Sequence, residues 1–376
     1  MKIVELCLSP SFGGLEIYVC RAVEYLARNH EIFTVTLPES PVRSRLQAGG
    51  HGVHLLDVWF PRFPLLAAIR LAGLIDRLNI DLVHVNWGPD LALAALAKRI
   101  SKRKPKLVFT RHMRITRPKR DPYHNFIYGQ FDYILAVTKE MEEGLHHYLV
   151  PGYRNRIGQS YCGVPAPTVW LDEAGREALR REHGLPPKAV VAGVFSRLEA
   201  AKGQHLLLEA IAILRDQGVI FHGLIVGKSM NDDYAQELRN RVSALGLENR
   251  IVFCDFVDQP QLLMQVCDCV LLPTDRETFG LVLVEAMRCG VAVVGSAAGG
   301  VPEIIEDEVS GLLFESGKAH DLALKLRKLY DDPNLRATLA DNGRKRAEQM
   351  FSAEKQLSKL AALFKEVVNE RAVARN

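Results

Sequence analysis

The stretch 269-CVLLPTDRETFGLVLVEAMRCGVAVVGS-296 decides the fold. A short apolar run is followed by a helical segment that starts near Thr278-Phe279-Gly280 and ends at Gly290. A second apolar run, VAVVGS, closes the stretch. A strand, a helix and a strand in this order indicate a parallel sheet covered by helices.

The same alternation runs through the whole chain. Expected strands are 2–8, 31–37, 53–58, 81–86, 106–112 and 133–138, then 189–196, 221–227, 250–256, 269–274, 291–296 and 311–314. Expected helices between them include 14–29, 90–100, 203–217 and 232–246. Two such series predict an α/β protein of two doubly wound, Rossmann-like domains.

Gly and Pro interrupt the periodicity in 158-GQSYCGVPAPTVW-170, where we expect the break between the domains. The predicted domains are 1–165 and 166–350, and the amphipathic segment 351–376 is expected to return as a helix to the first domain. A chain of 376 residues is long enough for two cores.

The composition is that of an ordinary globular protein, with 48% apolar and 24% charged residues. No apolar run reaches the ~18 residues of a membrane span. The N-terminal MKIVELCLSP is interrupted by Glu5, which predicts a strand and not a signal peptide. Seven cysteines without regular spacing favour reduced thiols, so we expect a cytoplasmic protein without a metal site.

Ligands of open α/β sheets bind beyond the carboxyl ends of the strands, so the residues that follow strands are the candidates. After the strand 189–196 come Arg197 and Lys202, with Gly203 opening a helix. Two cations at a helix N-terminus favour an anion site, although a solvated loop would look the same in sequence.

The helical segment after 269–274 carries two glutamates at the ends of an apolar run, Glu277 before the helix and Glu285 within it. Carboxylates bind vicinal hydroxyls, which sugars and ribose present. For an isolated pair at this spacing, a structural ion pair would be the simpler interpretation.

Glycine loops follow two further strands. In 298-AGGVPEII-305 and in 9-SPSFGGLE-16 two glycines would let backbone amides approach a ligand. The string GLIVGKS at 223–229 is not a Walker loop, because its first required glycine is His222. No dinucleotide fingerprint follows the first strand either.

Together, Arg197…Lys202-Gly203, Glu277-x7-Glu285, GGVPEII and SGLLF resemble glycosyltransferase family 4. The resemblance spans nearly the whole chain and implies the GT-B fold, two Rossmann-like domains facing each other across a cleft. It implies a retaining enzyme, similar to bacterial lipopolysaccharide-core and cell-envelope glycosyltransferases. Its donor would be a nucleotide-sugar, with UDP favoured over GDP or ADP and no bound cofactor.

The resemblance also implies a role for each matching residue. Arg197 and Lys202 would hold the donor diphosphate, Glu285 the ribose and Glu277 the transferred sugar. His112, in TRHM, would contact the sugar at the reacting centre, although a lone histidine at a strand end is usually structural. Backbone amides near the donor would come from Phe279, Gly280 and Leu281, and from Gly13 and Gly14 on domain closure.

Two positions depart from the family pattern. Residues 162-CGVP-165 occupy the position where relatives often have the motif NGVD, and Ser196 replaces a glycine before Arg197. Three alternatives share this architecture: a nucleotide-sugar epimerase, a phosphorylase and a catalytically silent sugar-nucleotide-binding protein. A silent protein should have lost Arg197, Lys202 or Glu285, and all three are present.

The acceptor would bind the first domain. Residues 1–165 hold 22 Lys and Arg against 14 Asp and Glu, and eleven of the basic residues lie in 98–120. This run has few of the aromatics typical of nucleic-acid binding. With Trp59, Phe60 and Phe63 nearby, Arg114, Arg117 and Lys119 predict a glycolipid or oligosaccharide acceptor and peripheral contact with an anionic membrane. The alternatives are a solvated basic face and an aromatic inter-helix core.

Overall fold

The computed structural model describes residues 1–58, 64–229, 232–257 and 259–373. The chain divides into two compact units. Met1–Gly163 and Ala353–Asn376 form the first unit, and Val164–Ser352 form the second. Each unit is built on a parallel sheet of its own.

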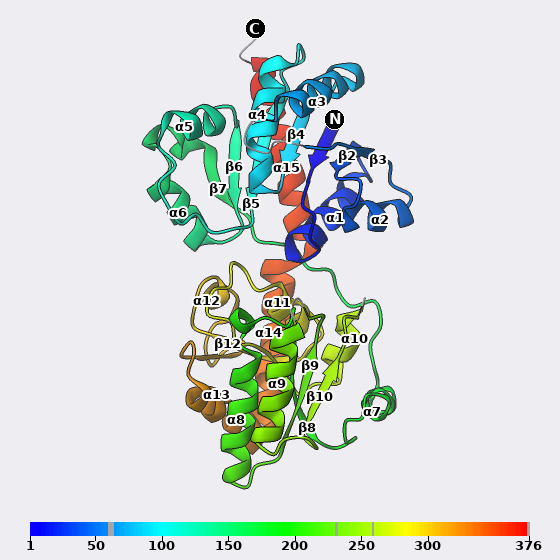
Figure 1. The fold of residues 1–376 in the computed structure, drawn as a ribbon, viewed down its shortest axis with the longest axis vertical. Coiled ribbons are helices and arrows are strands. Elements are labelled where there is room, and N and C mark those ends of the chain that lie inside the picture. The colour runs from blue at the N-terminus through cyan, green and yellow to red at the C-terminus, as the bar shows by residue number, and fades with distance from the viewer. Residues whose placement is uncertain (59–63, 230–231, 258, 374–376) are drawn as a thin grey trace. The chain divides into compact units, whose positions relative to one another are not determined.

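The first unit has a seven-stranded sheet of order β3-β2-β1-β4-β5-β6-β7, parallel at every pairing (Figure 1). Its strands are β1 (Lys2–Leu6), β2 (Glu31–Thr36), β3 (Val53–Leu55), β4 (Leu82–Val85), β5 (Lys106–Arg111), β6 (Tyr133–Ala136) and β7 (Ile157–Gln159). Strands β1, β2 and β3 follow one another toward one edge of the sheet, and β4 to β7 follow one another toward the other edge. The loops after the neighbouring strands β1 and β4 therefore diverge.

The helices of the first unit are α1 (Gly14–Leu26), α2 (Pro41–Ala48), α3 (Leu65–Leu78), η1 (Gly88–Asp90), α4 (Leu91–Ile100), α5 (Pro122–Gly129), α6 (Lys139–Tyr148), η2 (Pro151–Arg156) and α15 (Ala353–Val373). Helix α15 is the last in the sequence (red in Figure 1), yet it belongs to this unit. It contributes Phe364, which is fully buried with its ring 5.0 Å from that of His84.

The second unit has a six-stranded parallel sheet of order β10-β9-β8-β11-β12-β13. Its strands are β8 (Val190–Phe195), β9 (Phe221–Val226), β10 (Ile251–Cys254), β11 (Cys269–Leu272), β12 (Ala292–Ser296) and β13 (Leu312–Phe314). All four residues of β11 are buried, as expected for a central strand covered on both faces.

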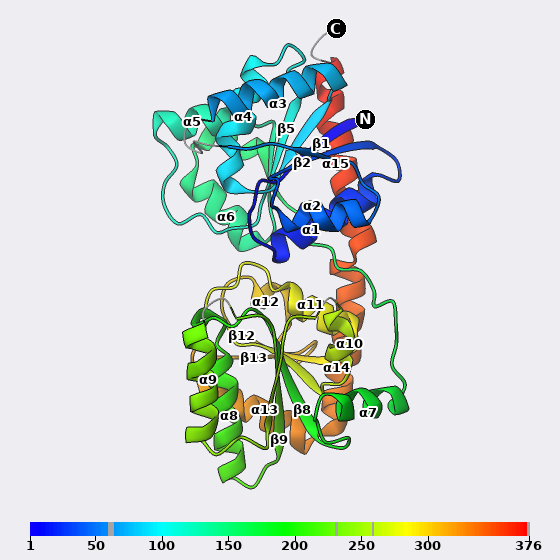
Figure 2. The ribbon, with the colours of Figure 1, turned by 45° about the vertical axis from the view of Figure 1, so that its right-hand side comes forward.

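The helices of the second unit are α7 (Glu173–Glu182), η3 (Ala200–Lys202), α8 (Gln204–Asp216), α9 (Asp232–Ala244), α10 (Pro260–Gln265), α11 (Leu281–Arg288), α12 (Val301–Ile304), α13 (Ala319–Asp331) and α14 (Pro333–Phe351). Figure 2 shows α8 and α9 on one side of the sheet and α10 and α14 on the other. The prediction of two doubly wound parallel sheets is confirmed. Strand β7 was not predicted, because three residues with Gly158 in the middle give no recognisable pattern.

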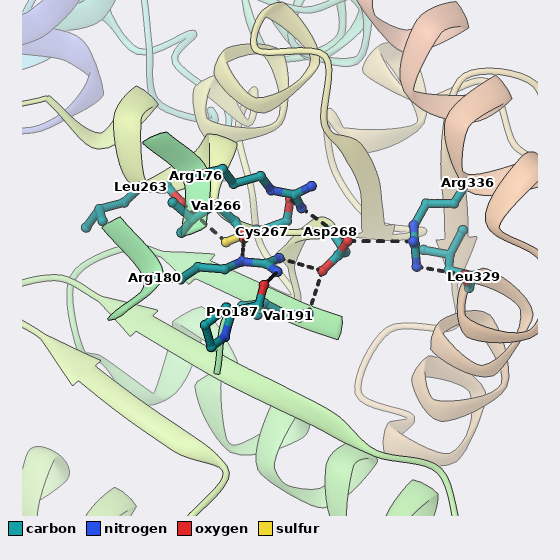
Figure 3. A network of polar contacts seen from close by, with 10 residues as sticks. All are labelled: Arg176, Arg180, Pro187, Val191, Leu263, Val266, Cys267, Asp268, Leu329 and Arg336. Atoms are coloured by element: carbon teal, nitrogen blue, oxygen red, sulfur yellow. Dashed lines mark hydrogen bonds and ion pairs between the residues drawn. The ribbon is translucent and has the colours of Figure 1, made fainter. Parts of the chain in front are cut away.

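A network of ion pairs closes the amino edge of the second sheet, around Asp268 at the start of β11 (Figure 3). Its Oδ1 accepts from Arg176 at 3.1 Å and lies 3.6 Å from Arg336. Its Oδ2 accepts from Arg180 at 2.9 Å and from the Val191 N–H at 2.8 Å. This edge lies at the opposite ends of the strands from the edge where open α/β sheets bind ligands, so we assign the network to stability.

Candidate functional site

Two loops leave the carboxyl ends of neighbouring strands in the second sheet, 196–203 after β8 and 273–280 after β11. The chain continues from β8 to β9 on one side and from β11 to β12 on the other. The loops therefore part at a topological switch point, which is where open α/β sheets bind ligands.

The loop after β8 is held in shape by Gln204, the first residue of α8. Its buried Nε2 donates to Ser196 Oγ at 2.9 Å and to the Arg197 carbonyl at 2.8 Å. Gly203 has a φ of +72°, and a Cβ there would lie 2.1 Å from the Pro273 carbonyl oxygen. The two loops thus approach so closely that this position requires glycine.

Two cations extend from this loop. The Arg197 side chain is 46% exposed and pairs with Glu199 at 3.2 Å. The Lys202 side chain is only 24% exposed, and its Nζ lies 3.1 Å from Glu277 Oε2. This ion pair joins the two loops of the switch point. The simpler interpretation of Glu277 as an ion-pair residue therefore describes a real contact, but its partner is another predicted site residue.

The backbone of Glu277 is fixed by the glycine loop after β12. The Gly300 N–H donates to the Glu277 carbonyl at 3.1 Å. A Cβ on Gly299, whose φ is +59°, would lie 2.1 Å from the same oxygen. The sequence predicted that these glycines bring their amides to a ligand. The structure instead shows the Gly300 amide bonded to Glu277, so the loop positions that residue.

Helix α11 begins at Leu281 after Gly280, whose φ of +106° turns the chain into the helix, and ends before Gly290 with φ +67°. This agrees with the predicted helix limits. Phe279 is buried, with its ring 5.8 Å from that of Phe351, and anchors the helix start. Glu285 lies about one turn into the helix and is partly exposed.

In the first unit, predicted site residues also follow strands. Gly13 precedes α1 in the loop after β1, Gly14 is the first residue of that helix, and His112 follows β5. Asn86, which the sequence did not single out, follows β4. All four residues lie at the carboxyl edge of the sheet.

His112 is held by two neighbours. Its Nε2 lies 3.4 Å from Asn86 Oδ1, and its ring packs edge-on against that of Tyr18, with centroids 4.7 Å apart. Burial, with a further contribution from nearby His84, lowers the pKa of His112 to about 3. The imidazole is therefore neutral near pH 7.

Asn86 in turn contacts a buried polar cluster on the strands. Glu5 of β1 and His84 of β4 face each other in register and are fully buried. His84 Nδ1 lies 2.9 Å from each Glu5 oxygen, and its Nε2 lies 2.7 Å from Thr110 Oγ1. The signal available in the sequence was a polar side chain within each of two apolar runs, Glu5 in IVELCL and His84 in LVHV.

The basic segment after β5 is only partly neutralised. Arg114 pairs with Glu140. Arg117 is exposed, and Lys119 is partly buried. Burial, followed by the neighbouring Arg117 and Arg111, lowers the pKa of Lys119, so these cations lie near one another. Of the other predicted acceptor residues, Trp59, Phe60 and Phe63 lie outside the described residues.

Comparison with known proteins identifies the family. The model described as "Glycosyltransferase Family 4" matches residues 12–166, and the model "Glycosyl transferases group 1" matches residues 175–346. The chain belongs to glycosyltransferase family 4. The two family models thus match residues in both units, and the protein is a glycosyltransferase.

Curated relatives of this glycosyltransferase are named for different molecules. The N-acetyl-alpha-D-glucosaminyl L-malate synthase of Bacillus anthracis is 27% identical over 98% of both chains. The D-inositol 3-phosphate glycosyltransferase of Corynebacterium glutamicum is 29% identical over 62% of this chain and 57% of its own length.

Among solved structures, the Anabaena protein HepE in complex with UDP superposes with a TM-score of 0.87. The match covers 97% of this glycosyltransferase and 100% of HepE at 25% identity. Two Rossmann-like domains are therefore common to both proteins.

Within residues 1–58, 64–229, 232–257 and 259–373, no three His, Cys, Asp or Glu side chains cluster as metal ligands would. None of the helices in the same ranges is both long and apolar enough to cross a membrane.

The arrangement in the second unit suits a glycosyltransferase. Cations and a carboxylate converge at a switch point, where the cations can stabilise an anionic leaving group and the carboxylate can accept from hydroxyls. Arg197, Lys202 and Glu277 lie after the strands where the sequence placed them, and their role as site residues stays a prediction. Gln204 was not predicted, because a buried glutamine at a helix start has no distinctive pattern.

Proposed function

We propose that this glycosyltransferase transfers a sugar, with retention of anomeric configuration, from a UDP-sugar to a hydroxyl group of an anionic acceptor. The observation that carries the donor site is the Lys202–Glu277 pair of 3.1 Å at the switch point of the second sheet. The UDP complex of HepE, at 25% identity, supports UDP as the nucleotide.

In this proposal Arg197 and Lys202 bind the donor diphosphate. The bond between the anomeric carbon and the diphosphate oxygen breaks, and its electron pair leaves with UDP. The acceptor oxygen bonds to the same carbon and gives its proton to the departing diphosphate. Charge on the diphosphate peaks during this step, so both cations stabilise the transition state more than the bound donor.

The other donor contacts follow from residue type and position. Glu285 on α11 would accept from the ribose hydroxyls, and Glu277 from hydroxyls of the transferred sugar. The amides of Phe279, Gly280 and Leu281 belong to the turn that starts α11. These amides would meet the sugar and the phosphates.

In the first unit we propose that His112 and the amides of Gly13 and Gly14 contact the donor. The same unit would bind the acceptor. Arg117 and Lys119, whose neighbour Arg114 is paired with Glu140, would then bind an acceptor anion.

A glycolipid of the cell envelope, such as a growing lipopolysaccharide core, is the acceptor we propose. Replacing Arg114, Arg117 and Lys119 by Glu should abolish co-sedimentation with anionic vesicles and lower transfer to lipid-linked acceptors. A small anionic acceptor is the second candidate, because relatives are named for L-malate and D-inositol 3-phosphate. Transfer to free anionic polyols, with no vesicle binding, would favour it and reject the glycolipid.

The donor site is tested by thermal unfolding with UDP, GDP, ADP and their sugars. A nucleotide at ~100 times its Kd stabilises by about 2.7 kcal/mol, which is a rise of about 5–10 °C for a domain of this size. Glu285→Ala should remove most of the UDP shift. Arg197→Ala and Lys202→Ala should depress kcat more than donor affinity. If no nucleotide shifted the transition, the donor site would be rejected.

A further inference from the structure

A series of polar side chains, of which Glu5 and Asn86 are buried and His112 is partly buried, leads from the middle of the first sheet to its carboxyl edge. It consists of Glu5 on β1, Asn86 after β4 and His112 after β5, and we call it the Glu5–Asn86–His112 chain. Its contacts determine which ring nitrogen of His112 carries the proton.

Glu5 is fully buried, so both carboxylate oxygens need hydrogen-bond donors. His84 Nδ1 lies 2.9 Å from each oxygen, and Asn86 Nδ2 donates to Oε2 at 3.0 Å. The ring of Phe364 from α15 packs against His84 at 5.0 Å. The carboxylate is thus enclosed and lies within hydrogen-bond distance of two side chains.

In the structure the Glu5 oxygens accept from Asn86, and a side-chain amide has one donating and one accepting end. Glu5 therefore fixes the orientation of Asn86, with the NH2 group toward Glu5. The amide oxygen of Asn86 is left facing His112, 3.4 Å from Nε2. Since this oxygen can only accept, Nε2 must be the nitrogen that carries the proton.

The orientation of the His112 ring is also restricted. Tyr18 packs on it edge-on at 4.7 Å and fixes its plane. Burial lowers the pKa of His112, so the ring has one proton, and Nδ1 has none. Nδ1 is therefore a hydrogen-bond acceptor.

We propose that Asn86 is a positioning residue that keeps His112 in the Nε2–H tautomer, and that Glu5 holds Asn86 in the required orientation. His112 Nδ1 then accepts a hydrogen bond from a hydroxyl group of the bound substrate. The inference rests on the proposed function only in that His112 contacts substrate. The tautomer is a property of the free protein.

The tautomer is measured by ¹⁵N NMR of the protein labelled at histidine, with His112 assigned by its loss in His112→Gln. Wild-type protein should show a protonated Nε2 and an unprotonated Nδ1. In Glu5→Gln the new side-chain amide can donate to Asn86, so the Asn86 amide can rotate and direct its NH2 group toward His112. Nε2 of His112 would then accept, and the ring proton should move to Nδ1. Glu5 does not contact His112 in the structure, so this shift would show that Asn86 transmits the effect of Glu5 to His112.

Activity is the second readout. Asn86→Ala and Glu5→Gln should lower kcat about 10–100-fold, the usual cost of losing a group that orients a histidine, with little change in donor KM. The control is Thr34→Val, because Thr34 is equally buried opposite Glu5, and its hydroxyl has no hydrogen-bond partner in the structure.

An unchanged His112 spectrum in folded Glu5→Gln and Asn86→Ala would overturn the proposal, as would a kcat equal to that of Thr34→Val. Neither result touches the donor site, which is judged by the UDP shift of wild-type protein. Conversely, a protein without a UDP shift could still show the expected tautomer.

Discussion

Replacing Glu277 by Gln is expected to separate UDP binding from sugar transfer. In the free protein Lys202 Nζ lies 3.1 Å from Glu277 Oε2, and the two side chains are 24% and 18% exposed. At this separation the Coulomb energy is about 5 kcal/mol for an effective dielectric constant near 20. Desolvation offsets much of it, and charged hydrogen bonds contribute a net ~1.5–3 kcal/mol.

A diphosphate that binds Lys202 must break the Lys202–Glu277 ion pair. It must also lie near the negative charge of Glu277. Glu277→Gln lowers the free energy needed to separate Lys202 from residue 277, and it removes the repulsion between the diphosphate and the carboxylate. We expect the Kd for UDP to fall about 10-fold, equivalent to ~1.4 kcal/mol, at the low end of that range. At the same time kcat should fall by about 100-fold, because the contact with the transferred sugar is lost in the transition state.

Titration calorimetry with UDP and steady-state release of UDP measure the two effects. The matched control is Glu199→Gln, since Glu199 pairs with Arg197 at 3.2 Å but the guanidinium is 46% exposed. An exposed pair contributes ~0–1 kcal/mol, so UDP affinity should change less than about fivefold. If Glu277→Gln weakened UDP binding tenfold, the pair would serve to position Lys202, and the reasoning above would be wrong.

Three further predictions concern stability, each measured by urea or thermal unfolding. Gly203→Ala places a Cβ 2.1 Å from a backbone oxygen and should cost more than ~3 kcal/mol, whereas Gly218→Ala, at a similar φ of +76° with no atom within 4 Å, should cost only about 1–2 kcal/mol. Asp268→Asn leaves Arg180, whose side chain is 4% exposed, without its counter-charge and should cost about 3–5 kcal/mol; a loss below 1 kcal/mol would contradict a structural role. Burial raises the pKa of Asp90 to about 7, above its unfolded value, so the folded state binds more protons between pH 4 and 7 and wild-type stability should fall across that window as pH rises. Asp90→Asn should therefore gain stability relative to wild type from pH 5 to pH 8, and a constant difference would show that this carboxyl does not titrate as described.

Much of the proposed donor site could be located from the sequence because its parts are local. Arg197, Lys202 and Glu277 each follow an apolar strand, and a residue that follows a parallel strand lies at the ligand-binding edge whichever strands are neighbours. The limits of α11 were equally accessible, since Gly280 and Gly290 flank an apolar run of helical length.

The remaining features depend on which strands lie side by side. Lys202 and Glu277 are 75 residues apart, and nothing in either segment specifies a contact at 3.1 Å. The glycines at 299 and 300 were predicted to face a ligand, but the tertiary structure places them against the Glu277 backbone.

By itself, the sequence determined the alternation of strands and helices and the residue types at the ends of the strands. These properties follow from periodicity and from the order of residues along the chain. Only the tertiary structure decided the strand neighbours, and with them the meeting of Glu5, His84 and Asn86. Hydrogen-bond direction depends on contacts between distant segments, so the protonated nitrogen of His112 is a property of the folded sheet.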